Sequence, residues 1–262
     1  MQTDSPILLD IKDHVAEIRF NRPKALNAIS VELGNMFREV IAEVASNPDV
    51  RVIVLSGEGR AFMAGGDLAF MRSAEDSSKA AQQLVDPMHT ALQLLAQAPQ
   101  PVIASVHGAI AGAGMSVSLF ADLVIAADDA IFNMAYVKVG NNPDCGGSWI
   151  LPRLVGLHKA LEIALLSDNI NAEEALRLGL INRVVPREKL AEETQAMAGK
   201  LALLAPLAVA SIKRLMRTSL EHTLKEHLDA ECENFVANAK TADFKEALSA
   251  FFEKRSAKFE GR

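Results

Sequence analysis

Two segments rich in glycine and alanine could present backbone N–H groups to a carbonyl oxygen. They are AFMAGGDL (residues 61–68) and GAIAGAGM (108–115), and each follows a predicted strand and precedes a predicted helix. Small residues let a backbone approach a ligand closely, and a helix N-terminus offers unpaired N–H groups with a favourable dipole. Two N–H groups aimed at one oxygen would form an oxyanion hole, worth about 3–4 kcal/mol per donor. Taken alone, each segment is explained at least as well by tight turns and close packing.

Asp144, in the segment NNPDCGGSW (141–149), is the residue best suited to move a proton. A carboxylate beside an oxyanion hole could remove a proton from the carbon next to the carbonyl and return it to another carbon. The apolar neighbours Val139, Trp149 and Ile150 are expected to desolvate this carboxylate and raise its basicity. An aspartate between proline and Gly-Gly is also typical of a helix N-cap, a role that Asp144 could have instead or as well.

The elements around these segments predict an α/β protein. Short links join strands and helices in alternation, which is typical of ββα or βαβ units. The expected strands cover residues 8–20 (a pair), 50–55, 99–106, 123–127 and 131–134, and the expected helices cover 31–47, 84–98 and 115–120. The stretch 71–85, which contains serines and aspartates, is expected to be a mobile loop or a short helix that shapes the pocket.

The character of the chain changes near Asn171, after which helices predominate. A helix is expected to end at Gly179 and a short strand to follow it. Further helices are expected at 190–204, 208–220, 223–239 and 242–258. We therefore predict a core over residues 1–195 and a helical C-terminal region over residues 196–262.

Composition narrows the classes of partner. The 262 residues carry a net charge of −6, which gives little support to binding of nucleic acid or an anionic membrane. Cys145 and Cys232 cannot build a disulfide framework, and no Cys or His spacing indicates a metal site. We expect a protein of the reducing cytoplasm that uses no metal or separate cofactor.

With these loops and with Asp144, the sequence resembles the crotonase superfamily, the enoyl-CoA hydratases and isomerases. The similar segments keep the family's order over nearly the whole chain: NRPKALNAIS, VIVLSGEGRAFMAGGDL, PVIASVHGAIAGAGMSVSLFADLVIA, FNMAYVKVGNNPDCGGSWILPRLVG, AEEALRLGLINRVV and FFEKR. The resemblance implies a ββα spiral core, a helical C-terminal trimerisation region, and homotrimers or homohexamers. It also implies an acyl-CoA thioester as substrate, so that CoA is part of the substrate.

The same resemblance assigns roles to residues. The N–H groups of Gly66 and Ala113 would hold the thioester oxygen. The residues expected to line the CoA groove are Arg22, Lys24, Ala25, Ala64, Asp67 and Leu68. Phe252 and Lys254 resemble tail residues that reach CoA, sometimes from a neighbouring subunit.

The acids favour an isomerase over a hydratase. The two glutamates of the family's hydratases fall at Ser116 and Tyr136, so the pair that activates water is missing. Asp144 falls where a set of isomerases and a dehalogenase carry a single acid. The sequence around Asp144 most resembles that of bacterial isomerases of phenylacetate breakdown, which act on 1,2-epoxyphenylacetyl-CoA. A hydratase, a dehalogenase-like hydrolase with Asp144 as nucleophile, and a non-catalytic CoA-binding scaffold stay open as alternatives.

Two further residues have open roles. His89 falls where the dehalogenase branch carries a histidine, although a helix-surface or packing role is the stronger expectation. Tyr136, the chain's single tyrosine, is expected either to contact the acyl group or to fill the core.

Overall fold

The computed structural model describes residues 5–262, and its centre is a six-stranded sheet. The strands lie in the order β1-β2-β3-β5-β7-β10, and only β1 and β2 pair antiparallel. Their bounds are β1 Ile7–Lys12, β2 Val15–Phe20, β3 Val52–Gly57, β5 Val102–Val106, β7 Leu123–Ala127 and β10 Arg183–Val185. The parallel strands are almost continuously apolar because helices cover both faces of this sheet.

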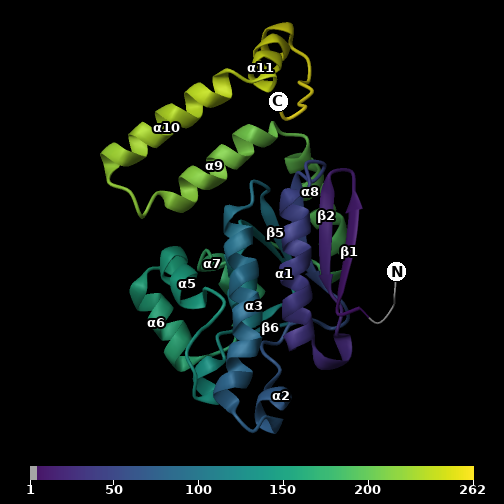
Figure 1. Cartoon of the computed structure of the whole chain (residues 1–262), viewed down its shortest axis with the longest axis vertical. Helices are drawn as coiled ribbons and strands as arrows, with labels where there is room; N and C mark the ends of the chain where they lie inside the picture. Colours follow the sequence, from purple (N-terminus) through teal and green to yellow (C-terminus); the bar gives the residue numbers. More distant parts are fainter. Residues whose placement is uncertain (1–4) are drawn as a thin grey trace.

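The alternation of side chains along each strand divides the apolar residues between two cores. In β3, Ile53 and Leu55 belong to the larger core, whereas Val52 and Val54 belong to the smaller one. Helices α1 (Val31–Ser46) and α3 (Ser77–Gln97) lie side by side over the larger core, and α8 (Leu190–Ala202) covers the other face (Figure 1).

A second sheet of short strands runs in the order β4-β6-β8-β9. Its bounds are β4 Ala61–Met63, β6 Ala109–Ala111, β8 Ile131–Asn133 and β9 Ile170–Asn171. β4, β6 and β8 come directly after β3, β5 and β7 of the large sheet, so that the chain forms successive ββ turns linked by helices. This arrangement is the expected spiral, and it places the ends of β4 and β6 next to each other.

The remaining helices surround one end of the sheets and then extend beyond them. Near the second sheet lie α2 Leu68–Ser73, α4 Ala113–Phe120, α5 Gly147–Val155, α6 Leu157–Leu166 and α7 Ala172–Arg177. Beyond α8, the C-terminal arm consists of α9 Pro206–Thr218, α10 Leu224–Ala239 and α11 Ala242–Glu253. Figure 1 shows this arm at the opposite end of the molecule from α2.

A buried charge cluster attaches the arm to the core. Lys213 of α9 lies 3.1 Å from one carboxylate oxygen of Asp122, and Arg217 lies 2.6 Å from the other. Lys213 Nζ also donates to the carbonyl oxygens of Leu95 and Gln100, so that this nearly buried ammonium has three acceptors. A buried charge is tolerated when it is paired and hydrogen-bonded in this way.

The sequence predicts most of these elements. The strand pair, the helix from Val31, the buried strands and the C-terminal helices lie where they are expected, with ends that shift by a few residues. The prediction for residues 71–85 is wrong: α3 begins at Ser77, because the Asp76 carboxylate caps it by accepting from the N–H groups of Ser78 and Lys79. The segment 108–114 contains the short strand β6 rather than loop alone.

The predicted division at residues 195 and 196 falls inside α8, which packs against the large sheet. The first four residues of the predicted core lie outside the described residues. No single helix within residues 5–262 has the length and hydropathy needed to cross a membrane. One pair of consecutive helical segments in this range, Arg187–Ala202 and Pro206–Thr218, meets both criteria when taken together, but the two segments are bent by 105° relative to each other.

Candidate active site

The two glycine-rich segments lie against each other at the ends of β4 and β6. Gly65 has φ +101° and Gly112 has φ +52°, a backbone region that favours glycine. A Cβ atom added to Gly112 would lie 3.7 Å from the Cα atom of Gly65, and one added to Gly65 would lie 3.8 Å from the backbone nitrogen of Ala113. The glycines therefore supply the turns, and they also bring the two loops within a few ångströms of each other.

Each loop leaves one N–H group without a protein acceptor. Gly65 O accepts from Ile29 N and Ile29 O accepts from Asp67 N, which leaves the Gly66 N–H between them unused. Ala113 is the first residue of α4, where N–H groups have no partner inside the helix. Within residues 5–262, neither N–H donates to a backbone or side-chain oxygen, and both residues line the same cavity. This geometry suits a carbonyl oxygen that gains negative charge.

The cavity beside these N–H groups is apolar on most of its wall. The apolar side chains that line it come from the loop before α1 and from α2, α3 and the 3-10 helix after β8: Ile29, Leu68, Met71, Ala81, Leu84, Val85, Met88 and Val139. Its polar side chains are Tyr136, Asn141 and Asp144, together with the thiol of Cys145. Asp144 is the one carboxylate that lines it in the described part of the chain.

Asp144 is hydrogen-bonded to a buried tyrosine. The hydroxyl of Tyr136 lies 2.5 Å from Asp144 Oδ1 and 2.9 Å from the Ser116 hydroxyl. Burial, and then the charge of Asp144, raise the pKa of the Tyr136 phenol far above its usual range. Ser116 and Tyr136, where the resemblance puts the hydratase glutamates, are thus joined to each other and to Asp144. Sequence reasoning does not reveal this contact, because it considers Tyr136 only as core or as an acyl contact.

The backbone that carries Asp144 has an unusual conformation. Cys145 has φ +49°, and its N–H donates to Nε2 of His89, 3.1 Å away on α3. That ring nitrogen therefore carries no proton in this contact. His89 is exposed on the helix surface, as expected, but its contact with the Asp144 segment is not evident from the sequence. Burial raises the pKa of the Cys145 thiol, and the charge of Asp144 adds to this effect.

The hypothesis that Asp144 is a helix N-cap is wrong. α5 begins at Gly147 with Gly146 as its N-cap, and no side chain caps it. A Cβ atom on Gly147 would lie 2.4 Å from the Ser116 hydroxyl oxygen, so only glycine lets α5 start this close to α4. Of the apolar neighbours expected around Asp144, Val139 lines the cavity, whereas Trp149 and Ile150 line a groove beside α9.

The residues expected to bind CoA lie on two neighbouring segments, 22–25 and 64–68, with one exception. Arg22 forms an ion pair of 3.2 Å with Asp67, whose other carboxylate oxygen caps α2 through the Phe70 N–H. Lys24 and Ala25 are exposed on the 3-10 helix Pro23–Ala25, and the Ala64 N–H donates to Leu26 O nearby. Ala64 and Leu68 line the cavity, and half of the Leu68 surface is exposed.

Lys254 is the exception. It follows α11 at the end of the C-terminal arm, and Figure 1 shows α11 at the opposite end of the molecule from α2, whose residues Leu68 and Met71 line the cavity. The structure of one chain therefore does not bring Lys254 or Phe252 to the site.

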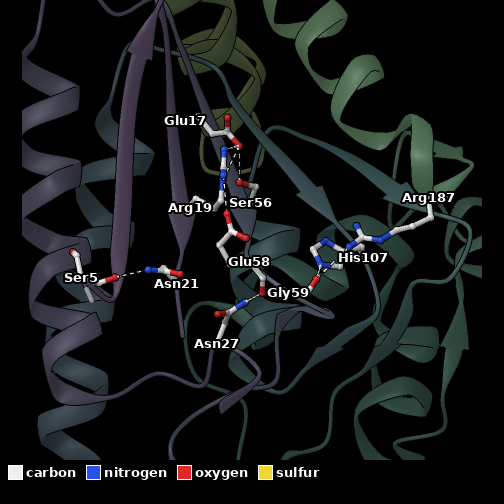
Figure 2. Close-up of polar contacts among 10 residues, drawn as sticks. All are labelled: Ser5, Glu17, Arg19, Asn21, Asn27, Ser56, Glu58, Gly59, His107 and Arg187. Atoms are coloured by element: carbon white, nitrogen blue, oxygen red, sulfur yellow. Dashed lines mark hydrogen bonds and ion pairs between the residues drawn. The ribbon is translucent and has the colours of Figure 1, made fainter. Parts of the chain in front are cut away.

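Two supporting residues fix the turn between β3 and β4. Buried Asn27 donates to the carbonyl oxygens of Glu58, Ala61 and Phe62, and His107 Nε2 lies 3.0 Å from the Gly59 carbonyl oxygen (Figure 2). Burial lowers the pKa of His107, and nearby Arg187 adds to this effect. These contacts tie the start of β4 to the start of β6, and hence the two loops to each other.

Comparison with known proteins assigns the fold and the family. The family profile described as enoyl-CoA hydratase/isomerase matches residues 10–262. A 1,2-epoxyphenylacetyl-CoA isomerase from Escherichia coli (strain K12) is 36% identical over 261 residues, with 98% of both chains covered. A crotonyl-CoA hydratase from Syntrophomonas wolfei is 34% identical over 254 residues, with 97% of both chains covered.

Solved structures agree with this assignment. An enoyl-CoA hydratase from Polaromonas sp. JS666 has a TM-score of 0.91 at 34% identity, and covers 97% of this chain and 99% of its own. A putative enoyl-CoA hydratase/isomerase from Mycobacterium abscessus has a TM-score of 0.94 at 30% identity, with 98% and 100% covered. The fold is that of the crotonase superfamily, as expected from the sequence. The chain is a member of the enoyl-CoA hydratase/isomerase family.

Proposed function

We propose that this enzyme isomerises an acyl-CoA thioester and that Asp144 moves the proton. The observation that carries the proposal is that one carboxylate of the described residues, Asp144, lines the same cavity as the free N–H groups of Gly66 and Ala113. A hydratase of this family would need a second acid, and Ser116 and Tyr136 stand where the resemblance puts the hydratase glutamates.

The proposed reaction uses these groups in two steps. The thioester oxygen accepts hydrogen bonds from the Gly66 and Ala113 N–H groups, which stabilises negative charge on that oxygen. The Asp144 carboxylate takes a proton from C2, and the C–H electron pair forms an enolate whose charge lies largely on the thioester oxygen. Protonated Asp144 then returns the proton to another carbon, C4 in the case of a 3-enoyl thioester, and the enolate collapses to the isomer.

The apolar wall supports an uncharged acyl group, either an enoyl chain or a ring-containing group such as that of epoxyphenylacetyl-CoA. Within residues 5–262, no lysine, arginine or histidine lines the cavity to pair with a second carboxylate on the acyl group. The CoA portion is proposed to lie along Arg22, Lys24, Ala25, Ala64, Asp67 and Leu68.

Product analysis tests this proposal. Purified enzyme is incubated separately with crotonyl-CoA, trans-3-hexenoyl-CoA and 1,2-epoxyphenylacetyl-CoA, and the products are followed by mass spectrometry and chromatography. We expect a product of unchanged formula from one of the last two thioesters, and loss of that product with Asp144→Asn. Full activity of Asp144→Asn would sink the mechanism.

Hydration is the second candidate, because relatives named as hydratases are about as similar to this chain as the relative named as an isomerase. Rapid gain of one water by crotonyl-CoA would favour it. A covalent adduct on Asp144 in a trapped turnover would instead favour a dehalogenase-like nucleophile.

Assembly and location are part of the proposal. The C-terminal arm exposes many large apolar side chains, which supports packing against other copies in a homotrimer or homohexamer: Leu207, Ile212, Met216, Leu220, Leu224, Phe235, Phe251 and Phe252. Lys254 would then reach CoA bound to a neighbouring subunit. A cytoplasmic location is proposed from the use of cysteine, with Cys145 and Cys232 both free.

A further inference from the structure

We infer that Tyr136 is a positioning residue for Asp144: its hydroxyl, supported by Ser116, holds one carboxylate oxygen and leaves the other for the substrate. The inference rests on the proposed function of Asp144 as the group that moves the proton. It concerns Ser116 and Tyr136, the positions where the resemblance puts the hydratase glutamates. It gives these two residues a role in a reaction that uses Asp144 as its single carboxylate.

The contacts form a short chain of hydroxyl groups that ends on the acid. Tyr136 Oη lies 2.5 Å from Asp144 Oδ1, and Ser116 Oγ lies 2.9 Å from Tyr136 Oη. Tyr136 is only 9% exposed and Ser116 is fully buried, so both hydroxyls are largely shielded from solvent. No N–H or O–H group within residues 5–262 donates to Oδ2 of Asp144. Besides the phenol, the carboxylate has the thiol of the adjacent Cys145 as a hydrogen-bond partner. The phenol therefore holds Oδ1, and no N–H or O–H group of the described residues holds Oδ2.

The proton between Tyr136 and Asp144 belongs to the tyrosine. Burial and the neighbouring carboxylate both oppose ionisation of the phenol and raise its pKa, so it stays a donor over the working pH range. An ionised carboxylate only accepts, so Tyr136 donates to Oδ1. Its oxygen can then accept from the Ser116 hydroxyl, which orders the chain as Ser116 to Tyr136 to Asp144.

The backbone on both sides of the Tyr136–Asp144 contact has features that allow it. Ala135 has φ +33°, which is costly for a residue with a Cβ atom, and the Asn133 side chain stabilises it by accepting from the Ala135 N–H at 2.8 Å. Asn133 is in turn held by the buried hydroxyl of Ser167. On the other side, Gly147 leaves room for the Ser116 hydroxyl. This strain is explained if the tyrosine must point at Asp144.

A fixed Oδ1 has one consequence for proton transfer. The rotamer of Asp144 is restricted, so that Oδ2 meets both carbons without a search among conformers.

The first test needs no substrate, because Tyr136 is the only tyrosine in the chain. Tyrosinate is followed by its near-ultraviolet absorbance during alkaline titration of the wild-type enzyme, Asp144→Asn and Ser118→Ala. We expect tyrosinate to form at lower pH in Asp144→Asn than in the wild type, because the carboxylate charge is gone. Ser118→Ala is the matched control: this buried serine of α4 donates to Met115 O and not to Tyr136. An equal onset in wild type and Asp144→Asn would overturn the inference.

The second test uses turnover of trans-3-hexenoyl-CoA, followed as formation of its isomer. Tyr136→Phe keeps the ring and removes the hydroxyl, and we expect kcat to fall about tenfold or more with little change in KM. Ser116→Ala should lower kcat in the same way but by less, and Ser118→Ala should leave kcat and KM unchanged. A wild-type kcat in Tyr136→Phe would overturn the inference.

The two proposals fail in different ways. Activity retained by Asp144→Asn would contradict the proposed function. Loss of activity in Asp144→Asn, combined with an unaltered kcat in Tyr136→Phe, would leave that function standing and contradict the positioning role alone.

Discussion

The residues proposed to act on a substrate in this cavity are few: the Asp144 carboxylate and the N–H groups of Gly66 and Ala113. The glycine-rich pattern and the lone acid make these residues visible in the sequence. The contacts of Asp144 with Tyr136, and of Cys145 with His89, are not visible there. They depend on left-handed conformations at Ala135 and Cys145, which nothing in those residue types predicts.

Replacing Ala113 with proline tests its N–H group directly. Ala113 is the first residue of α4, where proline is tolerated because the N–H has no partner in the helix. We expect kcat to fall by about 10²–10³-fold with little change in thermal stability, since the variant removes one oxyanion donor.

Leu157→Pro is the matched control, because Leu157 is the first residue of α6 and is exposed. It should keep the wild-type kcat. A wild-type kcat in Ala113→Pro would show that the Ala113 N–H does not act on the oxyanion.

At the scale of elements, two turns fix the relative position of the two glycine-rich loops, 61–68 and 108–115. β3 leads into β4 through the Gly59 turn, β5 leads into β6 through His107, and the His107 ring joins the two turns. The order of these elements is predictable from the alternation of strands and helices. The start of α3 was missed because its polar first turn resembles a loop until Asp76 is recognised as its cap.

The buried His107 makes stability depend on pH. Its folded-state pKa is lowered, so the unfolded chain binds more protons than the native state as the pH falls through about 6.5, the ordinary histidine value. The free energy of unfolding should therefore decrease on acidification from about pH 8 to about pH 5.

His107→Gln can keep a donor to Gly59 O without the titrating ring, and we expect it to lose part of this pH dependence. Thermal unfolding of both proteins across this pH range provides the measurement. Parallel melting curves at every pH would contradict the role of His107.

The anchor of α9 is a second feature at this scale. Asp122→Asn would leave Lys213 and Arg217 without their carboxylate, and an uncompensated buried charge costs about 3–5 kcal/mol. We expect a lower midpoint of urea unfolding than for the wild type. Asp86→Asn, at an exposed aspartate of α3, should keep the wild-type midpoint. Equal midpoints for all three proteins would show that the cluster contributes little.

At the scale of the whole molecule, the site and the arm lie at opposite ends of the chain's structure (Figure 1). The fold could be predicted because the similar segments span nearly the whole chain in order. How copies assemble does not follow from one chain, because the exposed apolar faces of α9 and α10 do not specify which surface of another copy covers them.

Assembly through the arm predicts a specific response to charge. Ile212→Glu combined with Met216→Glu places two carboxylates on exposed apolar positions of α9, so the molar mass measured by light scattering should fall. Leu176→Glu, at an exposed apolar position of α7, should leave it unchanged. A monomeric wild-type protein, or an unchanged mass for the double variant, would contradict assembly through this face.

The central claim is that Asp144 transfers the proton, and isomer formation in heavy water tests it most directly. trans-3-Hexenoyl-CoA is incubated in heavy water with the wild-type enzyme and with Asp144→Asn, and the isomer and its deuterium content are measured over time by chromatography and mass spectrometry. We predict isomer formation by the wild type, with deuterium in the isomer where protonated Asp144 exchanges with solvent before it returns the proton, and at most a trace of isomer with a folded Asp144→Asn protein. Equal isomer formation by the two proteins would contradict the claim and require another base.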